Sequence, residues 1–141
     1  MKYSMSSSRL TSVEYPVCMP TEEPSKVRKD LGVRTAEFAE RVRHWVRKIP
    51  RTLSTIEDAK QLLRSSGSVG ANYIEANEAF SKKDRAHKMK ICRKEAKEST
   101  YWLRLLSGFV SGDLEKERLA LCKESHELML IFNAIINKYL S

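Results

Sequence analysis

The sequence predicts an all-α protein: an antiparallel up-down-up-down four-helix bundle with a flexible N-terminal tail. From Thr35 onward, apolar residues recur at steps of three and four, which is the spacing of one face of an α-helix. No stretch shows the alternation of apolar and polar residues that is typical of a strand. The connections between the periodic stretches are short, and short connections between long helices favour antiparallel neighbours.

Residues 1–32 are expected to form a mobile tail, and residues 33–141 to form the bundle. The tail region holds three of the four prolines and the serine-rich run SMSSS, and its charges follow no helical period. Within this tail, residues 13–17 are the segment expected to make a short docking contact.

The first helix is expected over residues 35–49. Thr35 is its candidate N-cap, because a threonine hydroxyl can accept a hydrogen bond from a free amide of the first turn. Pro50 is expected to end this helix, since the residue before a proline is disfavoured in the helical conformation. Its apolar face is expected to consist of Phe38, Val42, Trp45, Val46 and Ile49.

The second helix is expected over residues 54–80, with Ser54 and Glu57 forming a capping box. Residues 64–80 read RSSGSVGANYIEANEAF and include many poor helix formers. Gly67 and Gly70 among them indicate that a neighbouring helix approaches the backbone closely. Two structured faces are expected, about 90° apart. The first comprises Leu53, Ile56, Leu63, Gly67, Gly70 and Ile74, and the second comprises Leu62, Ser66, Val69, Tyr73, Ala76 and Phe80.

The third helix is expected over residues 82–109 and the fourth over residues 113–139. Ser81 is the candidate cap of the third helix, with Asp84 in its first turn. Both helices carry apolar seams with alternating steps of three and four, as in antiparallel bundles whose helices cross at about 20°. The seam of the third helix comprises Met89, Cys92, Ala96, Ser99, Leu103, Leu106 and Val110. The seam of the fourth comprises Leu121, Ser125, Leu128, Phe132, Ile135 and Tyr139.

The remaining face of the second helix is polar but contains no lysine; it comprises Gln61, Ser65, Ser68, Asn72, Glu75 and Ala79. One interpretation is a solvent-exposed face that is low in charge. The other is that Asn72 and Glu75 are covered by another subunit or by a partner. A buried carboxylate must be paired, and the basic third helix could supply the cation.

The formal net charge of +8 is concentrated in two segments. Residues 34–51 hold six basic and two acidic residues, and residues 81–111 hold nine basic and three acidic residues. One arc of the third helix carries Lys83, Lys90, Arg93, Lys94, Lys97, Tyr101 and Arg104. A second cluster, in and after the first helix, consists of Arg41, Arg43, Arg47, Lys48 and Arg51.

These basic residues predict electrostatic binding of RNA, or of DNA, because Lys and Arg neutralise phosphates regardless of base sequence. Tyr101 could stack on a base or could serve in packing. The alternative is a scaffold whose basic face docks an acidic protein.

Catalytic motifs are not evident in the sequence, so a non-enzymatic protein without cofactor or metal is expected. The stretch GSVG lacks the Gly-Lys-Ser/Thr of a P-loop, and His126-Glu127 lacks the second histidine of a zinc motif. The cysteines form no CxxC pair. An enzyme would require Asn72, Glu75, Glu95 and Ser99 to line a pocket or to bind a metal ion. Without a signal peptide or a long apolar run, a cytoplasmic protein that does not enter a membrane is expected.

Two stretches resemble a known family, the four-helix-bundle proteins encoded in intervening sequences of bacterial 23S ribosomal RNA genes. Residues 62–75, LLRSSGSVGANYIE, match its Leu-x-Arg-Ser-x-x-Ser-Val-x-Ala-Asn-x-x-Glu pattern, and residues 94–103, KEAKESTYWL, match its second segment. The resemblance covers roughly residues 33–140. It implies a cytoplasmic bundle that assembles as a homopentamer.

A related branch of this family is the accessory variability protein of diversity-generating retroelements, a basic pentameric bundle that works with a reverse transcriptase and its template RNA. The resemblance therefore makes a reverse transcriptase, or another protein, a candidate partner. It also marks four signature polar positions, namely Asn72, Glu75, Glu95 and Ser99. We expect these four to form a hydrogen-bonded network within or between subunits, or only to orient the second and third helices.

Overall fold

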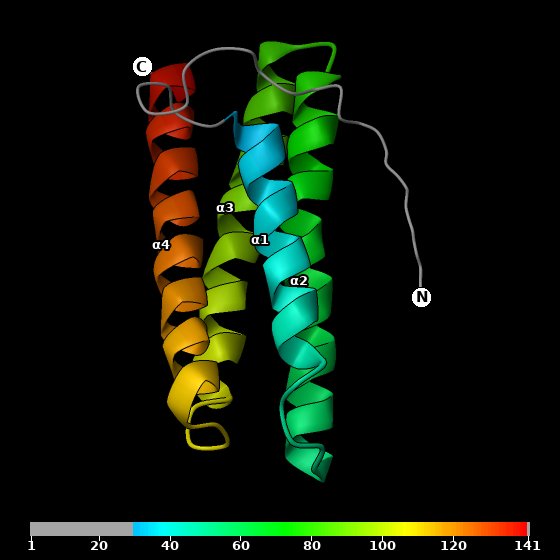
Figure 1. Cartoon of the computed structure of the whole chain (residues 1–141). Coiled ribbons are helices and arrows are strands. Elements are labelled where there is room, and N and C mark those ends of the chain that lie inside the picture. The colour runs from blue at the N-terminus through cyan, green and yellow to red at the C-terminus, as the bar shows by residue number, and fades with distance from the viewer. Residues whose placement is uncertain (1–29, 141) are drawn as a thin grey trace, which may run out of the picture.

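Four helices make up the computed structural model, which describes residues 30–140. They are α1 (Leu31–Val46), α2 (Leu53–Asn77), α3 (Lys82–Leu105) and α4 (Gly112–Leu140). Consecutive helices run in opposite directions, so that α1 begins at the end of the bundle where α4 finishes (Figure 1). The predicted all-α four-helix bundle is confirmed. Most of the predicted tail, including residues 13–17, lies outside the described residues.

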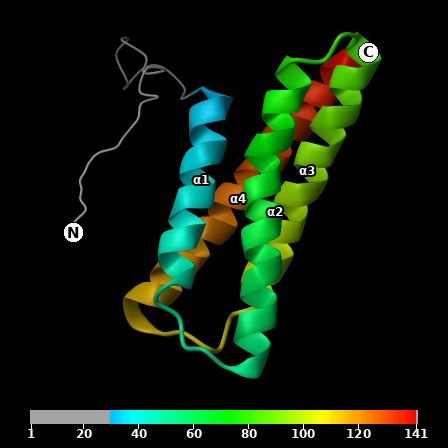
Figure 2. The ribbon, with the colours of Figure 1, turned by 90° about the vertical axis from the view of Figure 1, so that its right-hand side faces the viewer.

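The helices surround one core, and each packs against two neighbours. Contacts join α1 with α2, α2 with α3, α3 with α4, and α4 with α1. Figure 1 places α1 in front and α3 behind, and the turned view of Figure 2 places them on opposite sides. The two helices are therefore diagonal partners, and their outer faces point in opposite directions. None of the helices in residues 30–140 has the length and apolar character needed to cross a membrane.

The core takes large side chains from every helix. Its fully buried members include Phe38, Val42, Trp45, Leu62, Val69, Leu103, Leu121, Leu128 and Phe132. The indole nitrogen of Trp45 donates a hydrogen bond of 2.8 Å to the carbonyl oxygen of Leu114, so its polar group is satisfied at the edge of the core.

The predicted cap of α3 is confirmed, whereas those of α1 and α2 are wrong. Ser81 accepts a hydrogen bond from the amide of Asp84. Thr35 is buried inside α1, where its hydroxyl donates to the carbonyl of Leu31 at 2.8 Å. In α2 the capping box is formed by Thr52 and Thr55. The hydroxyl of Thr55 also donates to the carbonyl of Pro50, five residues earlier, and this local contact favours the earlier start.

Helix α1 begins before Thr35 because its first turn is held by α4. The Arg34 guanidinium lies 2.7 Å from a carboxylate oxygen of Glu124 and 2.8 Å from one of Glu127. Neither carboxylate is near Arg34 in sequence, so local patterns could not indicate the start. At the other end, α1 finishes at Val46 rather than at residue 49, although Ile49 still contributes to the core.

The predicted seam of α3 is confirmed over most of its length. Met89, Cys92, Ala96, Ser99, Leu103 and Leu106 are buried. In α4 the buried residue near the end is Ile136, whereas the predicted Ile135 and Tyr139 are only partly buried. A straight helix has 3.6 residues per turn, so an apolar stripe drifts away from a strict alternation of three and four. α3 itself ends at Leu105, ahead of Gly108, whose φ of 91° is incompatible with a continuing helix.

The first predicted face of α2 is wrong at its ends. Leu53 is 85% exposed and Ile74 is 64% exposed, and Phe80 of the second face is fully exposed beyond the helix. The neighbour on that side is α1, which has 16 residues against the 25 of α2 and covers only the middle of it.

The predicted close approach of a neighbouring helix is confirmed at Gly70, where α1 crosses α2, whereas at Gly67 only the end of one α1 side chain comes near. A Cβ on Gly70 would lie 3.0 Å from the hydroxyl oxygen of Thr35 and 3.3 Å from its Cβ. A Cβ on Gly67 would lie 3.1 Å from an outer nitrogen of Arg43. The poor helix former at position 70 is therefore compensated by a close helix contact.

Candidate nucleic-acid interface

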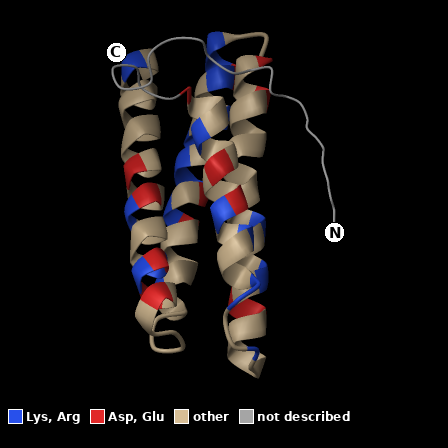
Figure 3. Cartoon of the chain, in the orientation of Figure 1, with Lys and Arg blue, Asp and Glu red and all other residues tan. Residues whose placement is uncertain are grey.

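The outer face of α3 carries the predicted arc, which we call the α3 row: Lys83, Lys90, Arg93, Lys94, Lys97, Tyr101 and Arg104. The seam of α3 points into the core, and helical geometry places the row on the opposite side. All of its members are exposed except Arg93, which is half-buried. Figure 3 shows Lys and Arg along α3, behind α1 in that view.

The middle of the row forms a shallow hollow of about 390 Å³. Its lining comprises Lys90, Arg93, Lys94, Lys97, Glu98 and Tyr101. The single acidic member of this lining, Glu98, forms an ion pair with Arg64 of α2. The hollow is therefore strongly positive, since its one carboxylate is already bound to another cation.

Most cations of the row have no carboxylate partner among residues 30–140. Lys83, Lys90, Lys97 and Arg104 form no ion pair within 4.0 Å in this part of the chain. Arg93 donates a hydrogen bond of 2.7 Å to the neutral side chain of Asn133. Lys94 is the exception, because its ammonium lies 3.6 Å from a carboxylate oxygen of Glu95. The other five cations of the row keep their positive charge for an outside anion.

Tyr101 is the one aromatic residue of the row, and it is 51% exposed. Its ring contacts that of Trp102 edge-on, with the two centroids 5.0 Å apart. Trp102 in turn packs against the core. Tyr101 is therefore supported from the protein side and open toward the hollow.

The second predicted basic cluster, which we call the α1 cluster, is partly occupied by contacts within the chain. Arg41 pairs with Glu117 of α4 at 3.2 Å. Arg43 donates hydrogen bonds to the carbonyls of Ala39 and Leu63, which places it in the contact between α1 and α2. Its remaining cations, Arg47, Lys48 and Arg51, are exposed.

The α3 row and the α1 cluster do not share a face, because α1 and α3 are diagonal partners (Figure 2). In one subunit, a short straight nucleic-acid segment on α3 cannot also lie along α1. Sequence reasoning could not detect this separation, since it depends on the order of the helices around the core.

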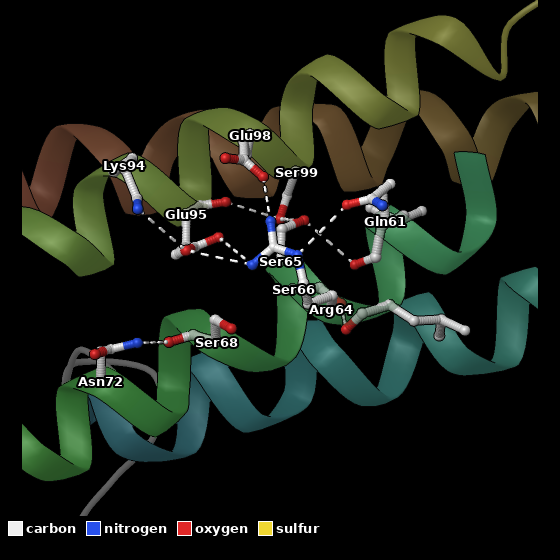
Figure 4. Close-up of polar contacts among 12 residues, drawn as sticks. Gln61, Arg64, Ser65, Ser66, Ser68, Asn72, Lys94, Glu95, Glu98 and Ser99 are labelled. Carbon is white, nitrogen blue, oxygen red and sulfur yellow. Dashed lines mark hydrogen bonds and ion pairs between the residues drawn. The ribbon is translucent and has the colours of Figure 1, made fainter. Parts of the chain in front are cut away.

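Two of the four signature polar residues meet between α2 and α3 (Figure 4). The hydroxyls of Ser65 and Ser99 lie 2.9 Å apart, and that of Ser99 also donates to the backbone carbonyl of Glu95. The buried carboxylate of Glu95 accepts from Arg64 at 3.3 Å. Arg64 was absent from the predicted network, although it stands opposite the signature glutamate.

The other two signature residues lie outside this cluster. Asn72 donates to the carbonyl of Ser68 in its own helix at 2.9 Å. Glu75 pairs with Lys88 of α3 at 2.5 Å, and its side chain is about half exposed. Within the described residues no hydrogen bond joins Asn72 to Glu75, Glu95 or Ser99. Within one subunit the four residues therefore form no continuous network. They take part in three separate groups of contacts: one around Ser99 and Glu95, one at Asn72 and one at Glu75.

The thiol of Cys92 is buried in the α3 seam, and burial raises its pKa to about 12. Cys92 therefore remains a protonated thiol near neutral pH. Among residues 30–140 no group of three or more His, Cys, Asp or Glu side chains is arranged to hold a metal ion.

The fold and this face define a class of protein: a basic four-helix bundle with a positively charged outer helix. More particularly, the chain belongs to the family of 23S rRNA-intervening sequence proteins, whose family model matches residues 31–133. The family resemblance seen in the sequence is thereby confirmed.

A solved structure similar to this chain is a protein of unknown function from the S23 ribosomal protein family of Bacteroides thetaiotaomicron. The two are 29% identical in sequence, and the match covers 76% of this chain and 98% of the other with a TM-score of 0.66. No curated protein matches the chain.

Proposed function

We propose that this protein is a non-enzymatic, cytoplasmic RNA-binding protein that acts as a homo-oligomer and contacts the phosphate backbone through the α3 row. DNA is the second candidate ligand, because the contacts are with phosphates. The observation that carries the proposal is that Lys83, Lys90, Lys97 and Arg104 lack carboxylate partners within residues 30–140 and lie together on one helix face. Four arginines of the other helices, by contrast, are paired with carboxylates: Arg34, Arg41, Arg64 and Arg118. Unpaired cations on an exposed helix favour a polyanionic partner.

The α1 cluster contributes less in this proposal. Its members Arg41 and Arg43 are bound to groups of the same chain, and α1 faces away from α3. Arg47 and Arg51 lie in the connection between α1 and α2, where they are exposed and available for a second segment of nucleic acid at that end of the bundle.

The proposed homo-oligomer is a pentamer, as the sequence resemblance implies. Support comes from large apolar side chains that a single subunit leaves exposed, among them Leu53, Ile74, Leu119 and Leu130. Burial of such side chains in a subunit contact is favourable. Light scattering on purified protein is expected to give a mass close to five times the 16.2 kDa of one chain. A monomer over a range of concentrations would contradict this part of the proposal.

The nucleic-acid proposal predicts a steep salt dependence that the α3 row controls. Each phosphate contact contributes roughly 0.7 to the slope of log K against log salt for single strands and roughly 0.9 for B-DNA. The variant Lys90→Gln/Lys97→Gln is therefore expected to flatten the slope by about 1.4 to 1.8. Fluorescence anisotropy with labelled oligonucleotides at several salt concentrations measures it.

A matched control is available on α4. Lys116 and Lys123 are also exposed and seven positions apart, so Lys116→Gln/Lys123→Gln removes the same charge from another face. This control is expected to leave the slope nearly unchanged. Equal slopes for the two double variants would refute the assignment to α3. The acidic-protein alternative is tested by a pull-down from lysate with the immobilised chain. Retention of a protein that persists after nuclease treatment, without retention of RNA from untreated lysate, would favour that alternative.

A further inference from the structure

Most cations of the α3 row lie in one line along the helix axis. Helical geometry places Lys90, Lys94, Lys97, Tyr101 and Arg104 within an arc of about 80°, because successive residues turn by about 100°. At about 1.5 Å per residue, this line of side chains, from Lys90 to Arg104, extends over about 21 Å along the helix. The row is therefore one side chain wide, and Tyr101 stands within it between the cations.

The surroundings of Tyr101 leave its ring available to a ligand. The ring lines the hollow together with Lys94 and Lys97, and it is 51% exposed. Trp102 supports it edge-on from the protein side. An aromatic ring held in this way, beside cations, is a platform for an unpaired base, and base stacking tolerates any sequence.

A duplex would use this arrangement poorly. In a duplex the faces of the bases are covered by their neighbours, and the major groove of A-form RNA is deep and narrow. Tyr101 would then find no base to stack on and would separate two groups of cations. A single strand can place its phosphates along the line of cations and turn one base toward the ring of Tyr101.

We propose that the α3 row binds single-stranded nucleic acid, with an unpaired base stacked on Tyr101 and the backbone following Lys90, Lys94, Lys97 and Arg104. This inference rests on the proposed function, that is, on phosphate binding by the same row. It adds the strandedness of the ligand and assigns a base-stacking role to one residue.

The test compares three fluorescein-labelled probes by anisotropy at fixed salt: a 12-nucleotide RNA strand, the same strand annealed to its complement, and the same strand without bases. DNA versions of these probes show whether the protein prefers an RNA strand or a DNA strand. Wild-type protein is expected to bind the intact strand most tightly. Tyr101→Leu is expected to weaken that binding about 5- to 100-fold, as loss of one stacked base predicts.

The same substitution is expected to leave the affinity for the duplex, the affinity for the base-free strand and the salt slope unchanged. Tyr101→Phe is expected to keep strand binding, since the ring remains. Phe109→Leu is the matched control, because Phe109 is an exposed aromatic residue beyond the end of α3. Thermal unfolding of each variant checks that the bundle is intact.

The outcomes separate this inference from the proposed function. If strand and duplex bind equally, with a slope that depends on Lys90 and Lys97, and Tyr101→Leu has no effect, phosphate binding stands and the stacking role is refuted. An equal loss for all three probes in Tyr101→Leu would assign Tyr101 a structural role and would also refute it. If no probe shows salt-dependent binding, the proposed function fails and the inference fails with it.

Discussion

Replacing Gly70 with alanine would insert a methyl group between α2 and α1 where the two helices cross. The new Cβ would lie 3.0 Å from the Thr35 hydroxyl oxygen and 3.3 Å from the Thr35 Cβ. Thr35 is buried, and its hydroxyl is held by the carbonyls of Leu31 and Gly32. The threonine therefore cannot rotate away, and the helices must separate.

Two opposing effects set the magnitude. Alanine is favoured over glycine in a helix interior by about 1 kcal/mol. Insertion of a methyl group into a well-packed contact costs about 1–3 kcal/mol. We expect the steric effect to exceed the gain at Gly70, so Gly70→Ala should lower the free energy of unfolding by about 1 kcal/mol.

Gly67→Ala is the matched control, three positions away on the same helix. Its added Cβ would meet only an outer nitrogen of Arg43, at 3.1 Å, and a long side chain can move at little cost. The helix-propensity gain should then prevail, and Gly67→Ala should raise the free energy of unfolding by up to about 1 kcal/mol. Urea unfolding followed by circular dichroism, at one protein concentration, measures both variants.

The steric explanation can be tested directly by a double-mutant cycle. Thr35→Ala removes the nearest atom, so it should relieve part of the cost of Gly70→Ala and give a coupling of about 0.5–1 kcal/mol. If Gly70→Ala stabilises the protein as much as Gly67→Ala does, or if the cycle shows no coupling, the reasoning from close helix contact is refuted.

Two further predictions concern stability. Glu95→Ala should lower the free energy of unfolding by about 1–2 kcal/mol, because it removes the partly buried hydrogen bonds that the buried carboxylate accepts from Arg64. Glu75→Ala breaks only the exposed pair with Lys88 and should cost less than about 1 kcal/mol. Equal urea midpoints for the two variants would contradict this ranking. Burial raises the pKa of Cys92 to about 12, so the unfolded chain loses its thiol proton first, and stability should fall as pH rises from about 8.5 toward 12. Cys92→Ala should make unfolding midpoints less sensitive to pH over this window, and an unchanged alkaline profile would contradict the assignment.

Helix number, order and most of the core could be predicted from the sequence, because these features depend on periodic burial along each helix. The seam of α3 from Met89 to Leu106 illustrates this: its apolar spacing alone places each side chain. The N-cap of α3 was also predictable, since the hydrogen bond that the Ser81 hydroxyl accepts from the amide of Asp84 is local.

Several errors occur where distant contacts override local patterns. The start of α1 depends on Arg34 and the carboxylates of α4. The start of α2 is a different case, because the contacts of Thr55 with Thr52 and Pro50 are local, and neighbouring hydroxyl residues offer alternative caps. Leu53 and Ile74 fit an apolar stripe but are exposed, because the length of α1 limits how much of α2 it can cover.

The candidate site was predictable in its residues but not in its arrangement. The α3 row follows from helical spacing, and the structure places it on one outer face. That Arg41 and Arg43 are engaged within the chain, and that α1 faces the other way, depends on how the helices are ordered in space. Charge totals along the sequence carry no such information.

The small size of α1 has a consequence for how the molecule opens. With 16 residues it is the shortest helix, and its contact with α4 is less extensive than that between α3 and α4. Cooperative units with the fewest buried contacts open at the lowest free energy. Amide hydrogens of α1 should therefore exchange with solvent ahead of those in α2, α3 and α4. The bundle would open locally by release of α1, while amides of the three longer helices remain protected from hydrogen exchange.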